Sequence, residues 1–150
     1  MAQSLFQTQL LRHPNLRAID REVMYSRHPS KMDPSGRRYV PAVNHHPAYG
    51  YSVFMYPGTK YGYNDRILPD GVTIEYHPST NSQLNNELDR LIGQEVTLYA
   101  QVGKQECRQG KVVISRSSTQ PSAPPVFHLK MMALQPVARK GLWADMTDSE

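Results

Sequence analysis

Hydrophobic and polar residues alternate in several short segments from residue 51 onward in this 150-residue chain. A period of two is the pattern of a strand with one buried face and one face in water. It is sharp in VTIEY (72–76) and is also found in EVTLYAQV, where Val96, Leu98, Ala100 and Val102 occupy one face. At least five strands are predicted in this way, over 51–56, 72–76, 95–102, 111–115 and 126–134.

Apolar residues recur at helical spacing in three other segments. In the clearest of them, Leu84, Leu88, Leu91 and Ile92 follow the i, i+4, i+7, i+8 pattern of one helical face. Gly93 is well placed to end this helix, because glycine readily adopts the left-handed conformation found after helix C-termini. The helices predicted in this way cover 4–12, 15–25 and 79–93.

These elements predict a single domain of the α+β class. Successive strands with one inserted helix favour a small, strongly bent antiparallel sheet or barrel, with the N-terminal helices packed outside. Several prolines and few apolar residues between 26 and 47 predict an irregular basic loop. The predicted parts are a helical N-terminal part (1–25), this loop (26–47), a β-rich core (48–137) and a polar tail (138–150).

Composition and charge narrow the class of protein. All apolar segments are shorter than the roughly 20 residues of a membrane-spanning helix, and the N-terminus lacks a secretory signal pattern. The single cysteine, Cys107, excludes an intramolecular disulfide. We therefore expect an intracellular protein, cytoplasmic or nuclear, with no membrane partner. The formal net charge is +4, but residues 1–66 carry +5 and residues 67–150 carry −1, which indicates a polyanionic partner for the basic half.

One stretch, KYGYNDRILPDGVTIEYHP (60–78), concentrates aromatic, amide and charged groups. Tyrosine rings stack on nucleobases, amides and carboxylates hydrogen-bond to base edges, and basic side chains neutralise phosphate. Such a set would suit the capture of an extruded base. The alternative is structural, because tyrosines in β-rich domains often pack at strand edges with their hydroxyls in water. The candidate base-binding residues in this stretch are Tyr61, Tyr63, Asn64 and Asp65.

Basic residues near this stretch and along the later strands are candidate phosphate ligands. One group follows an Asp-Pro-Ser-Gly turn, a second flanks the tyrosines, and a third is spread over the strands near 104–116. The structural alternative is a solvated strand face, which carries such charges routinely. The candidates are Arg37, Arg38, Lys60, Arg66, Arg108, Lys111 and Arg116.

The sequence contains no convincing catalytic signature. Asp70 and Glu75 with His77 resemble part of a metal-dependent nuclease site, but their spacing is short and a histidine replaces the expected lysine. Asp70-Gly71 more simply predicts a turn into the next strand. The histidines lack metal-ligand spacing, and phosphate-loop and nucleophile motifs are absent from the sequence. We therefore predict no catalytic residue, no metal site and no cofactor.

The order of these features resembles the PUA-like superfamily, and more narrowly the SRA-like domains linked to modification-dependent restriction enzymes. The resemblance covers about residues 50–134 and rests on Tyr63-Asn64-Asp65-Arg66, Asp70-Gly71, Ile74-Glu75-Tyr76, Asn85 to Leu88, Val96-Thr97-Leu98-Tyr99 and Pro124-Pro125-Val126-Phe127. It implies a bent barrel with a concave pocket for a flipped or modified base. It also implies that a nuclease partner or fused domain accompanies the module. The pocket walls would be Tyr63, Tyr76 and Tyr99, and Asp65 or Asn64 would read the base edge.

The sequence thus predicts a non-catalytic module that binds DNA through its basic N-terminal half and a tyrosine-lined pocket. The main alternative is a protein–protein adaptor or inhibitor, because the chain has nine tyrosines and seven methionines, and both types are enriched at protein interfaces. A third possibility is a small-ligand pocket or a hydrolase. Salt dependence separates the first two, since binding to a polyanion weakens steeply as salt rises.

Overall fold

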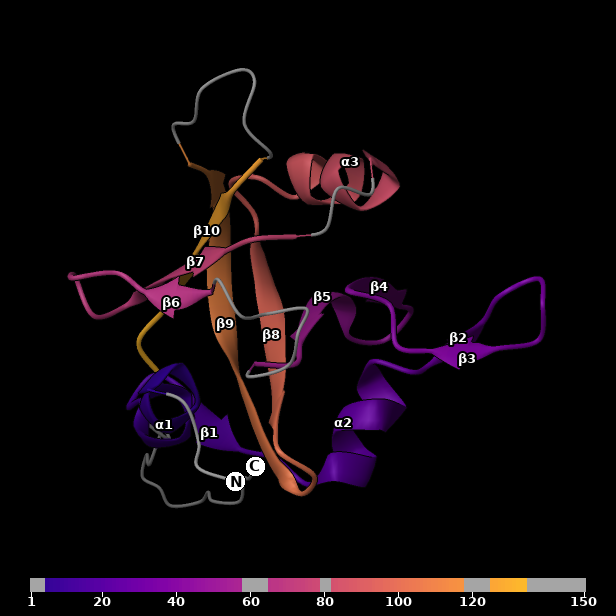
Figure 1. The fold of residues 1–150 in the computed structure, drawn as a ribbon, viewed down its shortest axis with the longest axis horizontal. Helices are drawn as coiled ribbons and strands as arrows, with labels where there is room; N and C mark the ends of the chain where they lie inside the picture. Colours follow the sequence, from indigo (N-terminus) through magenta and orange to yellow (C-terminus); the bar gives the residue numbers. More distant parts are fainter. Residues whose placement is uncertain (1–4, 58–64, 79–81, 118–124, 135–150) are drawn as a thin grey trace, which may run out of the picture.

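The computed structural model describes residues 5–57, 65–78, 82–117 and 125–134 (Figure 1). Within them the chain has the predicted α+β character. The helices are α1 (Leu5–Arg12), α2 (Arg21–Arg27) and α3 (Ser82–Arg90), and no described helix has the length and apolar character needed to pass through a bilayer. The strands are β1 (Arg17–Ala18), β2 (Lys31–Met32), β3 (Arg38–Tyr39), β4 (Val43–His46), β5 (Gly50–Met55), β6 (Arg66–Ile67), β7 (Thr73–Tyr76), β8 (Glu95–Val102), β9 (Glu106–Arg116) and β10 (Phe127–Met131).

Eight of these strands form one mixed sheet in the order β4-β5-β8-β9-β10-β7-β6, with β1 paired to β9 beside this path. β5 and β8 are parallel, because the chain between them passes through β6, β7 and α3 before it returns. β4 and β6 end the sheet at opposite edges and do not pair with each other. Two details of the predicted fold are therefore corrected: the sheet is open rather than closed into a barrel, and it is mixed rather than antiparallel.

β8 and β9 form a long hairpin through the middle of the molecule (Figure 1). Gly103 lies in its turn with φ of 77°, a conformation that favours glycine. β9 starts at Glu106, whereas the sequence predicted a strand only over 111–115. The first residues of β9 are polar and include a glycine, so their own pattern is weak. They are extended because they pair with β8 along its whole length.

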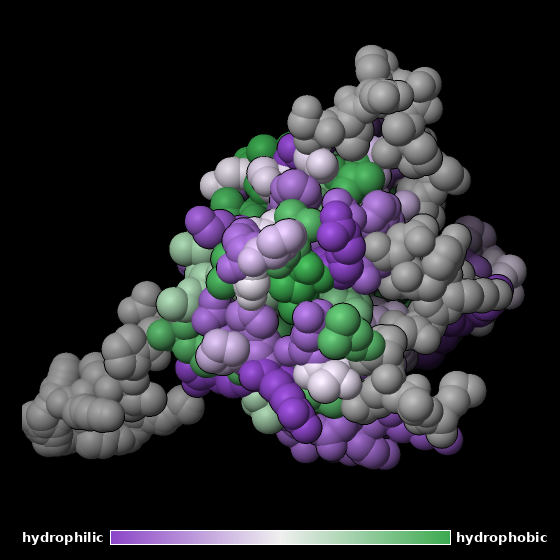
Figure 2. All heavy atoms as spheres, turned by 60° about the vertical axis from the view of Figure 1, so that its left-hand side comes forward, coloured by the Kyte–Doolittle hydropathy of each residue, from purple (hydrophilic) through white to green (hydrophobic). Residues whose placement is uncertain are grey.

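One face of the sheet carries the main hydrophobic core, to which α1 and α3 contribute Phe6, Leu10 and Leu88. The apolar face predicted for 95–102 is confirmed, since Val96, Leu98, Ala100 and Val102 are all buried in this core. On the molecular face shown in Figure 2, hydrophobic side chains lie in small groups between hydrophilic ones. The other core residues of the sheet include Val53, Met55, Ile74, Val112, Ile114, Phe127, Leu129 and Met131.

The opposite face of the sheet has a smaller core beneath α2. Met24 of α2 packs there with Phe54, Tyr99 and Cys107, which come from three neighbouring strands. Cys107 is thus a buried residue of a strand. This small core covers only part of the second sheet face, and the part that the described residues leave uncovered contains the site described below.

His28 follows α2 directly and is fully buried beside this smaller core. Its Nε2 lies 2.6 Å from the Pro41 carbonyl oxygen, and its Nδ1 lies 2.6 Å from Ser52 Oγ. A carbonyl oxygen only accepts, so Nε2 carries the proton and donates to Pro41, while Nδ1 accepts from the Ser52 hydroxyl. The ring is therefore held in one neutral tautomer.

Burial lowers the pKa of His28 below its ordinary value of 6.5, and the hydrogen bond to Pro41 opposes this shift only in part. The unfolded chain therefore binds more protons than the folded chain as pH falls below 6.5, and His28 contributes stability that is lost on acidification. We expect the NMR resonances of the His28 ring to titrate with a midpoint below pH 6.5. A midpoint at or above 6.5 would contradict a buried neutral ring.

The predicted helix over 15–25 is wrong in its first half. Leu16 is buried in the main core, and β1 pairs with β9, so this segment is extended. α2 begins only after Asp20, whose carboxylate accepts hydrogen bonds from the backbone N–H groups of Glu22 (2.9 Å) and Val23 (3.2 Å). An aspartate in this position satisfies N–H groups that lack partners within the helix, which explains where the helix starts.

The segment 26–47, predicted to be irregular, contains β2, β3 and β4. β2 and β3 form a separate two-stranded hairpin that projects from one side of the molecule (Figure 1). Asp33 holds its turn, since Oδ1 accepts from the backbone N–H groups of Ser35 (3.0 Å) and Arg37 (2.9 Å). The predicted tail, 138–150, lies outside the described residues.

Candidate functional site

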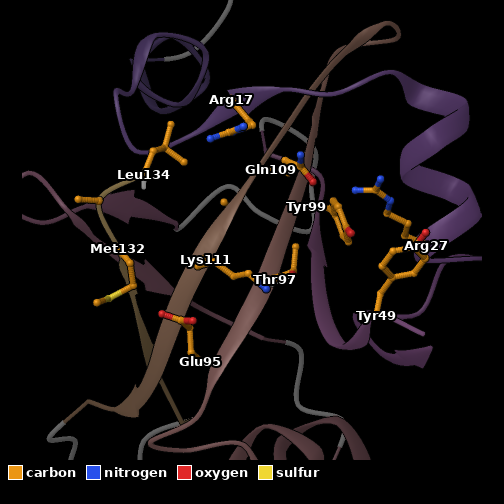
Figure 3. A pocket seen from close by; sticks show the side chains of 12 residues that line it. Arg17, Arg27, Tyr49, Glu95, Thr97, Tyr99, Gln109, Lys111, Met132 and Leu134 are labelled. Atoms are coloured by element: carbon orange, nitrogen blue, oxygen red, sulfur yellow. Dashed lines mark hydrogen bonds between the residues drawn. The ribbon is translucent and has the colours of Figure 1, made fainter. Parts of the chain in front are cut away.

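The uncovered part of the second sheet face is hollowed into a pocket of about 570 Å³, which we call the β8–β9 pocket (Figure 3). Strands β8 and β9 form its floor. The end of α2 and the turn after β4 flank it on one side, and the chain after β10 flanks it on the other. Its lining residues are Arg17, Arg27, Tyr49, Glu95, Thr97, Tyr99, Gln109, Gly110, Lys111, Met132, Ala133 and Leu134.

Strand register explains why five polar side chains of the pocket share one face of the sheet. Tyr99 is paired with Gln109, and Gln109 is paired on its other side with Arg17 of β1. Thr97 is paired with Lys111, one step further along the same face. Directly paired residues point to the same side of a sheet, so the register places a phenol, an amide and a guanidinium in one row across three strands.

Arg27 lies between two tyrosines at the edge of this floor. Its Cζ atom lies 4.9 Å from the centroid of the Tyr49 ring, a cation–π contact. Figure 3 shows its side chain reaching from α2 toward both Tyr49 and Tyr99. Burial raises the pKa of the Tyr99 phenol, and the charge of Arg27 opposes that rise. Tyr49 is 53% exposed and Tyr99 only 2% exposed, so a ligand would reach Tyr49 before Tyr99, at the part of Tyr49 that Arg27 and the His46 ring (4.9 Å between centroids) leave open.

The pocket carries an excess of positive charge. Within the described part of the chain, Arg17, Arg27 and Lys111 line it together with a single carboxylate, that of Glu95. Among the described residues, none of these three cations forms a salt bridge. Lys111 Nζ donates to Thr97 Oγ1 at 3.0 Å, which holds the ammonium group over the floor. The arrangement can therefore bind an anionic group and a planar group side by side.

The structure does not bring Tyr76 and Tyr99 into one pocket. Tyr76 is paired with Phe127, which is paired with Arg116 of β9, whereas Tyr99 is paired with Gln109 of the same strand. Positions 109 and 116 are an odd number of residues apart, so the two tyrosines point to opposite faces of the sheet. Tyr76 is 7% exposed within the main core, and its role there is packing.

Asp65 is buried, with 6% of its surface exposed, and lies outside the β8–β9 pocket. Its Oδ1 accepts a hydrogen bond from the backbone N–H of His77 at 2.8 Å. Burial raises the pKa of this carboxyl to about 7, while that hydrogen bond and the His77 charge act in the opposite direction. The other candidates from the same stretch, Lys60, Tyr61, Tyr63 and Asn64, lie outside the described residues.

Of the described candidate phosphate ligands, Lys111 alone lines the β8–β9 pocket. Arg37 and Arg38 belong to the β2–β3 hairpin, where Arg38 Nη1 donates to Ser30 Oγ at 3.2 Å. The other three arginines form ion pairs with carboxylates: Arg66 with Glu75 (2.9 Å), Arg108 with Glu106 (3.4 Å) and Arg116 with Asp89 (2.9 Å).

The nuclease-like set does not form a metal site. Asp70 holds the predicted turn, because its carboxylate accepts from the backbone N–H groups of Val72 (3.0 Å) and Thr73 (2.9 Å). Glu75 pairs with Arg66 and lies 3.2 Å from the His77 ring. Across the described part of the chain, no cluster of three or more His, Cys, Asp or Glu side chains is placed to hold a metal ion.

Only Tyr99 and Lys111 of the described lining residues were identified from the sequence; those missed include Arg17, Arg27, Tyr49 and Gln109. Arg17 and Arg27 were assigned to a helix and to a loop margin, where a basic residue is ordinary. The available signal was the basic excess of residues 1–66, which indicated a polyanion partner without indicating which cations converge. Their convergence depends on the pairing of β1 with β9, which joins segments about 90 residues apart.

Comparison with protein-family models, with curated proteins and with solved structures finds no match for the chain. The resemblance to the PUA-like superfamily therefore stays a prediction. What the chain binds has to be argued from the chemistry of the β8–β9 pocket.

Proposed function

We propose that the chain is a non-catalytic nucleic-acid-binding module whose β8–β9 pocket receives one nucleotide extruded from a DNA strand. The observation that supports this most directly is the composition of the pocket. Three cations that form no salt bridge with any described residue and an exposed tyrosine surround one cavity of about 570 Å³. Ligand pockets in proteins commonly have volumes of about 300–1,000 Å³, and a nucleotide needs both charge neutralisation and a stacking surface.

Each part of a nucleotide has a suitable group in this pocket. Arg17 and Lys111 would neutralise the phosphates on either side of the extruded base, because both side chains rise from the pocket floor. The exposed ring of Tyr49 would stack on the base, a contact typically worth about 1–3 kcal/mol. The side-chain amide of Gln109, which can both donate and accept, would meet the base edge.

A modified base is the finer form of the proposal, and its support is the resemblance to SRA-like domains together with the presence of a pocket. The pocket proposed here uses Tyr49 beside Tyr99, in place of the Tyr76 wall that the resemblance implied. Partnership with a nuclease, in trans or as a fused domain, would give such a module its biological effect.

The test is fluorescence anisotropy with labelled DNA at two salt concentrations. The probes are a fully paired duplex, the same duplex with one mismatch, the same duplex with modified cytosine, and a single strand. We expect steep weakening between low and physiological salt, and tighter binding of the mismatched and single-stranded probes, since extrusion of an unpaired base costs less. No binding of any probe at low salt would refute the proposed function.

A charge-matched pair of variants locates the site. Replacing Arg17 and Lys111 together with glutamine should weaken binding at low salt by about tenfold or more and reduce the salt slope by about two, one per lost phosphate contact. The control replaces Arg37 and Arg38 with glutamine, which removes the same charge from the β2–β3 hairpin. A larger loss in the control than in the pocket variant would show that the hairpin, and not the pocket, binds the backbone.

A further inference from the structure

The outer edge of β4 has backbone groups that no described strand pairs with. Among the described strands, β4 is the last on its side of the sheet and has β5 as its single neighbour. The N–H of Phe54 donates to the carbonyl of Ala42 at 2.8 Å, so these two form a hydrogen-bonded pair in an antiparallel ladder. Counted from Ala42, every second residue along β4 therefore makes its backbone hydrogen bonds to β5. Val43 and His45 lie between these positions, so their N–H and C=O groups point away from the sheet.

A groove of about 270 Å³ lies next to this edge, between α3 and the sheet face on which Val43, His45 and Tyr51 lie. Val43 and His45 line it from β4, and Arg90 and Leu91 line it from the end of α3. The His45 ring packs on Tyr51, with 4.6 Å between their centroids, which gives the groove an aromatic wall. An open strand edge beside a groove under a helix is the geometry with which proteins bind extended peptides by strand addition.

Charge in the groove favours an acidic occupant. Lys31 of β2 and Arg90 of α3 line the groove, and Glu87 is the single carboxylate among its described lining residues. Among the described residues, neither Lys31 nor Arg90 is in a salt bridge. A carboxylate on an added strand would therefore meet two cations that have no carboxylate partner within the described part of the chain.

We propose that this edge is a docking site for an extended segment of a partner protein that carries an acidic side chain. The segment would pair with Val43 and His45 and place its carboxylate between Lys31 and Arg90. Pro41 and Pro47 flank β4 and limit the pairing to this short stretch, which predicts affinities in the micromolar range or weaker. The site is separate from the β8–β9 pocket, since the two share no lining residue.

The test passes a degenerate pool of nine-residue peptides over the immobilised full chain and sequences the bound fraction. Aspartate or glutamate should be enriched at one position, relative to the input pool. In the His45→Pro variant the enrichment should disappear, because proline removes the outward-facing N–H, and an edge strand tolerates proline where that N–H faces solvent. His45→Thr keeps the N–H and should retain the enrichment.

A further variant guards against misfolding of His45→Pro. Arg90→Gln changes only the surface of α3 and should reduce acidic enrichment at least severalfold while the circular dichroism spectrum stays unchanged.

Three results would each overturn the proposal: no enrichment of any sequence, equal enrichment of acidic and basic residues, or enrichment that His45→Pro leaves intact. Concentration-dependent dimerisation that His45→Pro abolishes would also overturn it, since the occupant would then be a second copy of this chain. DNA binding by His45→Pro should match that of the unmodified chain, so either proposal can fail without the other.

Discussion

Replacing Gly110 with alanine is expected to lower the free energy of unfolding by about 2–3 kcal/mol, because the new methyl group has no room. A Cβ atom at this position would lie 2.6 Å from Leu16 Cδ2 and 2.9 Å from the backbone oxygen of Asn15. Leucine can adjust its rotamer, but a backbone oxygen moves only with its segment. That segment is held in place, since Asn15 Nδ2 donates to the Met131 carbonyl at 3.1 Å.

Urea denaturation of the unmodified chain, Gly110→Ala, Leu16→Ala and the double variant measures this effect. In a strand, alanine is otherwise the more favourable residue, because glycine loses more conformational freedom on folding. A loss of stability therefore reports the clash and not propensity. The double variant should be more stable than the sum of the single effects predicts, since truncating Leu16 relieves the closest contact. Gly110→Ala with unchanged stability would contradict the close approach of β1 to β9.

The same glycine links the fold to the candidate site. Gly110 allows the chain before β1 to cross β9 at short range, and this crossing places Arg17 beside Gln109 on the floor of the β8–β9 pocket. If the pocket binds DNA as proposed, Gly110→Ala should weaken that binding under conditions where the variant is still folded. Circular dichroism at the assay temperature separates the two effects.

Local patterns predicted the elements whose own residues carry a strong period. Val96 to Val102 alternate apolar and polar positions, and Leu84 to Leu91 follow a helical period, so β8 and α3 were identified correctly. Strands that are extended only because they pair with a neighbouring strand were not predicted. β1 and the first half of β9 have weak patterns of their own and are extended because each lies against a neighbouring strand. Similarly, nothing within β5 or β8 indicates that they pair in parallel, since this depends on the crossover through α3.

The site was predicted less well than the fold, for a related reason. Alternation within a strand shows that two faces exist, but it does not show which face of one strand adjoins which face of another. Tyr76 and Tyr99 each follow the expected alternation, and only the register through β10 and β9 places them on opposite sides of the sheet. Lys111 was identified because it is basic and lies on a strand. Its proximity to Arg17 was not predicted, because it depends on the register of β1, β9 and β8.

Asp65→Asn is expected to stabilise the fold by about 2–4 kcal/mol above pH 8 and to have little effect near pH 4. The folded-state pKa of Asp65 is raised from 3.8 to about 7, chiefly by burial. A carboxyl with a raised pKa contributes stability that is fully present below pH 3.8 and is lost as pH rises through about 7, because a buried charge then forms. Asparagine has nearly the same shape, and its carbonyl oxygen can accept the hydrogen bond from the His77 N–H.

The difference in stability between variant and unmodified chain isolates this carboxyl, whereas the pH profile of the unmodified chain alone would not. The contribution of His28 to the stability of the fold is lost as pH falls below 6.5, whereas that of Asp65 is lost as pH rises. The two effects therefore oppose each other over part of the same pH range. The difference, from urea denaturation at intervals between pH 4 and 9, should rise and level off above pH 8.

Asp70→Asn is the matched control, and its expected pH dependence has the opposite sign. Hydrogen bonds, of which the one from the Thr73 side chain is the largest cause, lower the pKa of Asp70. Its carboxylate therefore stabilises the fold above pH 3.8. A flat difference for Asp65→Asn across this range would mean that the carboxylate is hydrated in the folded protein, and Asp65 would then belong to an accessible surface rather than to the margin of the core.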